Sequence, residues 1–114
     1  MVPVRTDVTG EQQAAVRALC EAFPAMPRHE AFNIADMAFR VRGLHNVWMS
    51  ADLPERDKAE ALATAYVRHH MTPYDDLLPR YGDRDRQQRL RLARDLVRPR
   101  VQATLDAWRR TDGQ

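Results

Sequence analysis

The chain has 114 residues and a formal net charge of +2, which suits one domain with a single core and is too short for two domains of ordinary size. Its composition, 44% apolar and 30% charged residues, is typical of a folded soluble helical protein and excludes extensive disorder. The sequence has no run near the roughly 20 apolar residues of a bilayer span, no signal-peptide pattern at its start and one cysteine, so it excludes an internal disulfide and predicts a cytoplasmic protein with no membrane partner.

The spacing of apolar residues and helix breakers predicts an all-α fold, a compact bundle of four to five helices. This single domain is expected to occupy residues 9–110. Residues 1–8 are expected to form a flexible N-terminal arm and residues 111–114 a frayed tail.

The first helix is predicted from Gly10 to about Phe23, because Thr9 is a suitable N-cap and Pro24 stops the helix. One helical stripe of it is apolar: Val16, Leu19, Cys20 and Phe23. Cys20 is therefore expected to be a small buried apolar residue. A nucleophilic thiol, which needs a nearby histidine and some exposure, is the alternative.

A second helix is predicted from about Arg28 to Arg42, with Pro27 in its first turn and Gly43 just past its end. The following segment, residues 44–53, has no clean period, so it is either a loop with one helical turn or a short extended piece. Two of its large side chains are expected to dock on the core: Trp48 and Met49. Two polar ones either face solvent or line a cleft: His45 and Asn46.

The third helix has the clearest pattern. It is predicted to begin at Pro54, with Ser50 or Asp52 as the cap, and to end near His70 or Met71. Its three alanines would let another helix approach closely: Ala59, Ala61 and Ala63.

A short helix is predicted next, with Thr72 as its N-cap and Pro73 as its first residue. Asp75 can return a hydrogen bond to the Thr72 N–H, as in a capping box. Gly82 is expected to end this helix near Tyr81.

The last and longest helix is predicted from Arg84 to about Arg110, with Asp83 as its N-cap. Pro99 in its middle removes one backbone hydrogen bond and clashes with the preceding turn. A kink or a break is therefore expected over residues 95–98.

Five arginines of this helix lie within roughly 80° of one another on a helical wheel: Arg84, Arg91, Arg94, Arg98 and Arg109. Residues 66–114 carry a net charge of +4, whereas residues 1–65 carry −2. Guanidinium groups suit phosphates, so the stripe predicts contacts to DNA or RNA. Codon usage can equally explain the high arginine content, and a solvated face with salt bridges to nearby aspartates is the alternative to a binding surface.

Polar residues gather where the third helix ends and the short helix begins: Arg68, His69, His70, Tyr74 and Asp75. A His–Asp pair can serve acid–base chemistry, and a third ligand from His29 or His45 would make a metal site. However, adjacent histidines on a helix point about 100° apart, and Asp75 can instead cap the short helix or pair with Arg68. We therefore predict no metal, no cofactor and no catalytic residue here, and treat this corner as a possible functional site.

The run from Tyr66 to Leu78 resembles the signature of the family called domain of unknown function 2293, found in bacteria and fungi, which reads His-x-Arg-His-x-x-Thr-x-Tyr-Asp-x-Leu-Leu. Other matching positions are similar to its upstream connection and closing helix: Phe23 to Pro27, Asp83 to Asp85, Arg94, Arg98, Val101 and Leu105 to Arg109. The resemblance covers about residues 20–110. Two departures are a Gly43-to-Trp48 segment in place of a Ser/Gly/Arg-rich turn, and Tyr66 or Val67 where the family tends to have histidine. The resemblance implies no activity.

Taken together, these patterns predict a small binding domain whose favoured ligand is nucleic acid, held by the arginine stripe. The alternative is a protein-interaction or homo-oligomerisation module, in which a partner or a second copy covers exposed apolar residues: Trp48, Met49 and Trp108.

Overall fold

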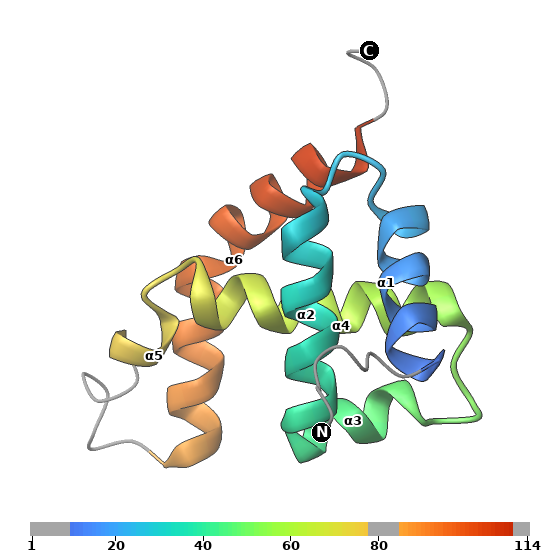
Figure 1. The fold of residues 1–114 in the computed structure, drawn as a ribbon. Coiled ribbons are helices and arrows are strands. Elements are labelled where there is room, and N and C mark those ends of the chain that lie inside the picture. Colours follow the sequence, from blue (N-terminus) through green and yellow to red (C-terminus); the bar gives the residue numbers. More distant parts are fainter. Residues whose placement is uncertain (1–9, 78–84, 111–114) are drawn as a thin grey trace, which may run out of the picture.

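The computed structural model describes residues 10–77 and 85–110, which form six helices and no strand (Figure 1). Their bounds are α1 Gly10–Ala22, α2 Arg28–Arg40, α3 Arg42–Trp48, α4 Glu55–His70, α5 Tyr74–Leu77 and α6 Arg86–Arg109. The predicted all-α bundle with a long C-terminal helix is confirmed. None of the described helices is both long and apolar enough to cross a membrane.

Several predictions fall outside the described residues: the arm over residues 1–8, the Thr9 cap, the Gly82 end of the short helix near Tyr81, the Asp83 cap, Arg84 and the tail over 111–114.

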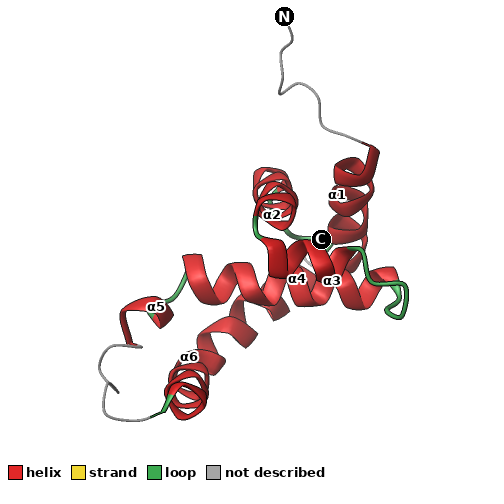
Figure 2. Ribbon diagram, turned by 90° about the horizontal axis from the view of Figure 1, so that it is seen from below, coloured by secondary structure: helices red, strands yellow, loops and turns green. Residues whose placement is uncertain are grey.

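Helix α4 forms the middle layer of the bundle. Helices α1 and α2 run antiparallel beside each other, and both pack across one side of α4 (Figures 1 and 2). Helix α3 packs against α2 and α4, whereas α6 packs against the other side of α4 and also contacts α5. Ala59 and Ala63 of α4 are fully buried, so their small side chains permit close helix contacts, while Ala61 faces solvent.

The core draws large apolar side chains from the helices on both sides of α4, and the fully buried ones include Leu19, Ile34, Leu62 and Leu105. Burying each such side chain stabilises the fold by about 2 kcal/mol. Trp48 and Trp108 are also buried within the chain, so neither needs a partner to cover it, whereas Met49 remains 49% exposed.

The turn between α1 and α2 is tied to the end of α6. The Ala25 N–H donates to the Trp108 carbonyl oxygen at 2.7 Å, and the rings of Phe23 and Trp108 meet edge to face with centroids 6.3 Å apart. Pro27 is the N-cap of α2, with an extended backbone, rather than part of its first turn.

A single residue, Val41, separates α2 from α3, which corrects the prediction of one helix from Arg28 to Arg42. Val41 has φ −102° and ψ 116°, an extended conformation that its β-branched side chain favours. The chain then returns to helix, so Gly43 lies inside α3 rather than past the end of α2. Residues 44–48 of the ambiguous segment therefore belong to α3, a helix of seven residues.

The starts of two helices differ from the predicted caps. Helix α4 has Pro54 as its N-cap and no side-chain cap, while the Ser50 hydroxyl accepts a hydrogen bond from the Asp52 N–H instead. Helix α6 has Asp85 as its N-cap, whose carboxylate accepts from the Gln88 N–H at 2.9 Å.

Pro99 lies inside α6, which continues without a break from Arg86 to Arg109. The helix changes direction near its middle, as both views of the ribbon show (Figures 1 and 2). The predicted kink is therefore present, and it divides α6 into an N-terminal half near α5 and a C-terminal half that reaches the α1–α2 turn.

Candidate functional site

Helix α6 has the highest net positive charge of the described helices. It contains seven arginines and two aspartates, a net charge of +5, whereas residues 10–77 carry a net charge of −3. This asymmetry is larger than the one between the two halves of the sequence, because the acidic residues of the chain lie mainly on the other helices.

The structure separates the arginines of the predicted stripe into two groups. Arg91 and Arg94 are exposed and make no ion pair with any described residue. Arg98 pairs with Asp95 at 2.7 Å, and Arg109 pairs with two carboxylates. Arg84 lies outside the described residues.

Arg109 is held by contacts within the fold. Its guanidinium donates to Glu60 of α4 and to Asp106 at 2.8 Å, and it lies 5.3 Å from the centroid of the Phe23 ring. The hydrogen bond to Glu60, above all, raises the pKa of Arg109. These contacts join α6 to α4, so this guanidinium is not available to a ligand.

The corner between α4 and α5 is built around Thr72. Its hydroxyl accepts a hydrogen bond from the Tyr74 N–H at 3.2 Å and donates to the Arg68 carbonyl oxygen. Thr72 therefore closes the end of α4 and supports the start of α5 together, although α5 begins at Tyr74 rather than at Pro73.

His69 and Asp75 face each other across this corner, with Nδ1 and Oδ1 2.8 Å apart. Asp75 thus pairs with His69, rather than with Arg68 or the Thr72 N–H. Because an ionised carboxylate only accepts hydrogen bonds, Nδ1 of His69 is the donor in this contact. The Tyr74 ring supports the imidazole edge-on, with centroids 5.1 Å apart.

Arg68 is the unusual cation of the corner. Its guanidinium lies over the Tyr74 ring, 5.4 Å from the centroid, and its Nε is buried with no hydrogen-bond partner among the described residues. Burial lowers the pKa of Arg68, and the nearby positive charge of Arg94 lowers it further. The charge of Arg68 on α4 is thus influenced by that of Arg94 on α6, the helix that packs against α4.

An open pocket of about 730 Å³ lies between α2, α3 and the last turns of α4. Four of the five predicted corner residues line it: Arg68, His69, His70 and Asp75. Tyr74 is buried and packs against Arg68 and His69. The pocket thus brings the corner residues together with side chains from α2 and α3.

The α2 wall of this pocket contains two charged residues that the sequence did not single out. Asp36 and Arg40 of α2 form an ion pair at 2.9 Å, which their spacing of four residues could have suggested. Tyr66 donates a hydrogen bond to Glu30 at 2.7 Å, and the His70 ring packs on Tyr66 with centroids 4.8 Å apart. The Tyr66–Glu30 contact joins α4 to α2 and has no signature in the sequence.

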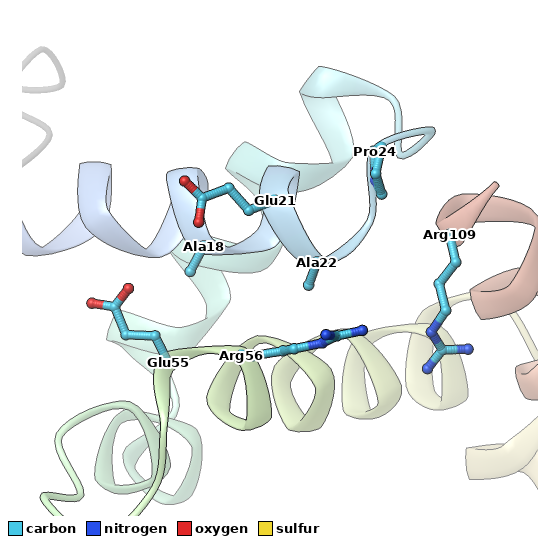
Figure 3. Close-up of a pocket in the computed structure, with 7 residues that line it drawn as sticks. All are labelled: Ala18, Glu21, Ala22, Pro24, Glu55, Arg56 and Arg109. Carbon is cyan, nitrogen blue, oxygen red and sulfur yellow. The ribbon is translucent and has the colours of Figure 1, made fainter. Parts of the chain in front are cut away.

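A second, smaller pocket lies between α1 and the first turns of α4. Figure 3 shows the Arg56 side chain extending along α4 toward Arg109, while Glu21 and Glu55 point toward the other end. Arg109 is already engaged by two carboxylates, so this pocket has less to offer an anion than the corner does.

A metal has no evident place in the described part of the chain. No three His, Cys, Asp or Glu side chains of residues 10–77 and 85–110 lie close enough together to hold an ion. Cys20 is partly buried against the core and forms no disulfide.

A family model described as an uncharacterized conserved protein (DUF2293) matches residues 18–109, which is most of the chain. No curated protein and no solved structure matches it. The family resemblance that the sequence suggested is confirmed, and the description of the family names no activity.

Proposed function

The chain belongs to the family called domain of unknown function 2293, and we propose that it is a nucleic-acid-binding domain that contacts phosphates through the N-terminal half of α6. The proposal is supported by two arginines of this half that form no ion pair with a described residue. Arg91 and Arg94 point into solvent without a carboxylate partner in the described chain, on the helix that concentrates its positive charge. Such guanidinium groups attract phosphates and release condensed counterions.

The proposed surface extends beyond α6 to Arg68. This residue lies on α4, which packs against α6, and its positive charge and that of Arg94 repel each other. A phosphate between them would relieve that repulsion and accept hydrogen bonds from both guanidinium groups. Arg98 and Arg109 of the predicted stripe are left out of the surface, because carboxylates of the chain already hold them.

An interaction module is the alternative function, and less supports it. The large apolar side chains exposed in the described residues are scattered over α2, α6 and the connecting segments: Phe32, Val41, Met49, Leu53, Met71 and Leu96. Single exposed apolar residues are normal on a monomer. The uneven distribution of charge therefore favours nucleic acid over an apolar protein partner.

Fluorescence anisotropy with labelled DNA and RNA, at roughly 50 and 200 mM salt, tests the proposal. We expect binding that weakens steeply with salt and that is abolished in the double variant Arg91→Glu, Arg94→Glu. The circular dichroism spectrum should stay helical, because both side chains are exposed.

A matched control reverses two other exposed arginines, Arg17 of α1 and Arg56 of α4, which also lack an ion pair with any described residue. This control makes the same change in net charge, so it should reduce affinity only slightly. Equal losses in both double variants would show that net charge, and not the α6 surface, governs binding. Absence of binding by the unaltered protein at the lower salt would refute the proposal.

A further inference from the structure

Arg68 belongs to two surfaces at once. It lines the open pocket between α2, α3 and α4, and it belongs to the helix against which α6 packs. A ligand bound along the N-terminal half of α6 could therefore extend to the pocket through Arg68. This adjacency raises the question of which part of a nucleic acid the pocket could accept.

The walls of the pocket suit a flat ring. His70 and Tyr66 present a packed pair of rings on one side, and Val41 and Leu44 contribute apolar surface on the other. Nucleobases bind proteins in single strands by stacking on aromatic or histidine rings and by hydrogen bonds at their edges. Asn33 supplies an amide for such a hydrogen bond. The volume of about 730 Å³ lies within the range of small-molecule sites.

The charges of the pocket are mostly compensated. Asp36 is paired with Arg40, and Asp75 is paired with His69. Arg68 is the lining arginine that has no ion pair within the described residues, and its Nε is buried without a hydrogen-bond partner there. An anionic group is therefore best placed at the Arg68 side of the pocket.

We propose that this pocket receives one unstacked nucleotide of a single strand, with its base against the Tyr66–His70 rings and its phosphate at Arg68. This inference rests on the proposed function and narrows it to single-stranded nucleic acid. A base inside a duplex is stacked and paired, so it cannot enter the pocket unless it is first extruded. Duplexes would then bind α6 through their phosphates alone.

A pocket-filling variant tests this without weakening the fold. Gly43 lines the pocket from within α3, and a Cβ added there would meet nothing within 4 Å. Gly43→Phe should therefore fold normally while its ring occupies the site. Gly10→Phe is the matched control, because Gly10 is also helical with open space around it and does not line the pocket.

The measurement compares single strands and duplexes of about 12 nucleotides, within the site sizes of known single-strand binders. We expect Gly43→Phe to lose about tenfold in affinity for single strands, as the loss of one stacked base would cause, and to keep its duplex affinity. His70→Ala should act in the same direction, whereas Gly10→Phe should match the unaltered protein.

Each other outcome contradicts the inference. Unchanged affinity of Gly43→Phe for single strands, or an equal loss for duplexes, would refute nucleotide binding in the pocket. Neither result would contradict phosphate binding by the α6 surface. Binding of a nucleoside monophosphate with no preference for single strands would show that the pocket serves free nucleotides instead. Failure of the unaltered protein to bind any strand would refute the proposed function itself.

Discussion

Arg109 and Glu60 join the last turn of α6 to α4 through a hydrogen-bonded ion pair, and the same guanidinium reaches Asp106 and the Phe23 ring. Both side chains of the pair are partly exposed, so solvent screens their attraction. We expect Arg109→Ala to destabilise the protein by about 1 to 2 kcal/mol, through the lost pair and the lost ring contact. Urea unfolding of Arg109→Ala, Glu60→Ala and the double variant should give a coupling energy of about 1 kcal/mol. A coupling energy near zero would show that the Arg109–Glu60 pair does not contribute to stability.

The salt dependence of binding gives a count of phosphate contacts. Each neutralised phosphate of duplex DNA contributes about −0.9 to the slope of log K against log salt. Arg94→Gln should therefore make the slope for a duplex shallower by about one unit. Arg98→Gln should change the slope less, because Arg98 is already paired with Asp95. Equal changes of the slope in the two variants would contradict the conclusion that Arg94 is available to a phosphate while Arg98 is not.

Tyr66 gives the fold a dependence on alkaline pH. Burial, with the hydrogen bond to Glu30 as a second cause, raises the pKa of Tyr66 above its ordinary value of 10.0. The folded state then holds the proton more tightly than the unfolded state, so this stability is fully present below pH 10 and is lost as pH rises through the folded pKa. Tyr66→Phe should lower the free energy of unfolding by about 1 kcal/mol at neutral pH. Above pH 10, the free energy of unfolding of this variant should fall less steeply than that of the unaltered protein. Parallel pH profiles for the two proteins would contradict the assignment.

Trp108 anchors the end of α6 in the core beside Phe23. It is 7% exposed, so Trp108→Ala should destabilise the protein by about 3 to 5 kcal/mol, measured by denaturant unfolding. Leu96→Ala on the same helix is a suitable control, because Leu96 is 58% exposed and its loss should cost under about 0.5 kcal/mol. A small effect of Trp108→Ala would mean that α6 is not fixed at this end.

Asp85 begins α6 by accepting the Gln88 N–H. Asp85→Ala should cost about 1 kcal/mol of stability, whereas Asp85→Asn, which caps about as well, should cost little. Thermal unfolding followed by circular dichroism would separate the two variants. Equal destabilisation by alanine and asparagine would indicate that the charge, rather than the cap, supports the helix start.

The sequence predicted the parts of this fold that depend on local signals. The stripe of α1, the stop at Pro24 and the kink at Pro99 all follow from helical periodicity and proline chemistry, and the structure confirms them. The break at Val41 was missed because Gly43 offered a stronger local signal for a helix end. Extended backbone at Val41 and packing of α3 on α2 and α4 allowed that glycine to remain helical.

The candidate site was harder to predict, because it depends on contacts between distant segments. The sequence located the corner from Arg68 to Asp75, but it could not show that α2 and α3 complete a pocket there. It grouped Arg109 with Arg91, because a straight helical wheel ignores both the kink and the carboxylate of Glu60 on α4. Pairing with carboxylates, on α4 for Arg109 and within α6 for Arg98, decides which arginines are available.

The width of the pocket depends on the backbone conformation of one residue, Val41. The direction of α3 relative to α2 depends on the two backbone torsions of this one residue, and α3 supplies part of the pocket wall. A β-branched residue favours those torsions in the extended region, so Val41 helps to fix the position of this wall. Relatives could therefore acquire a wider or narrower pocket by exchanging a single side chain at this joint, with the three-layer bundle unchanged.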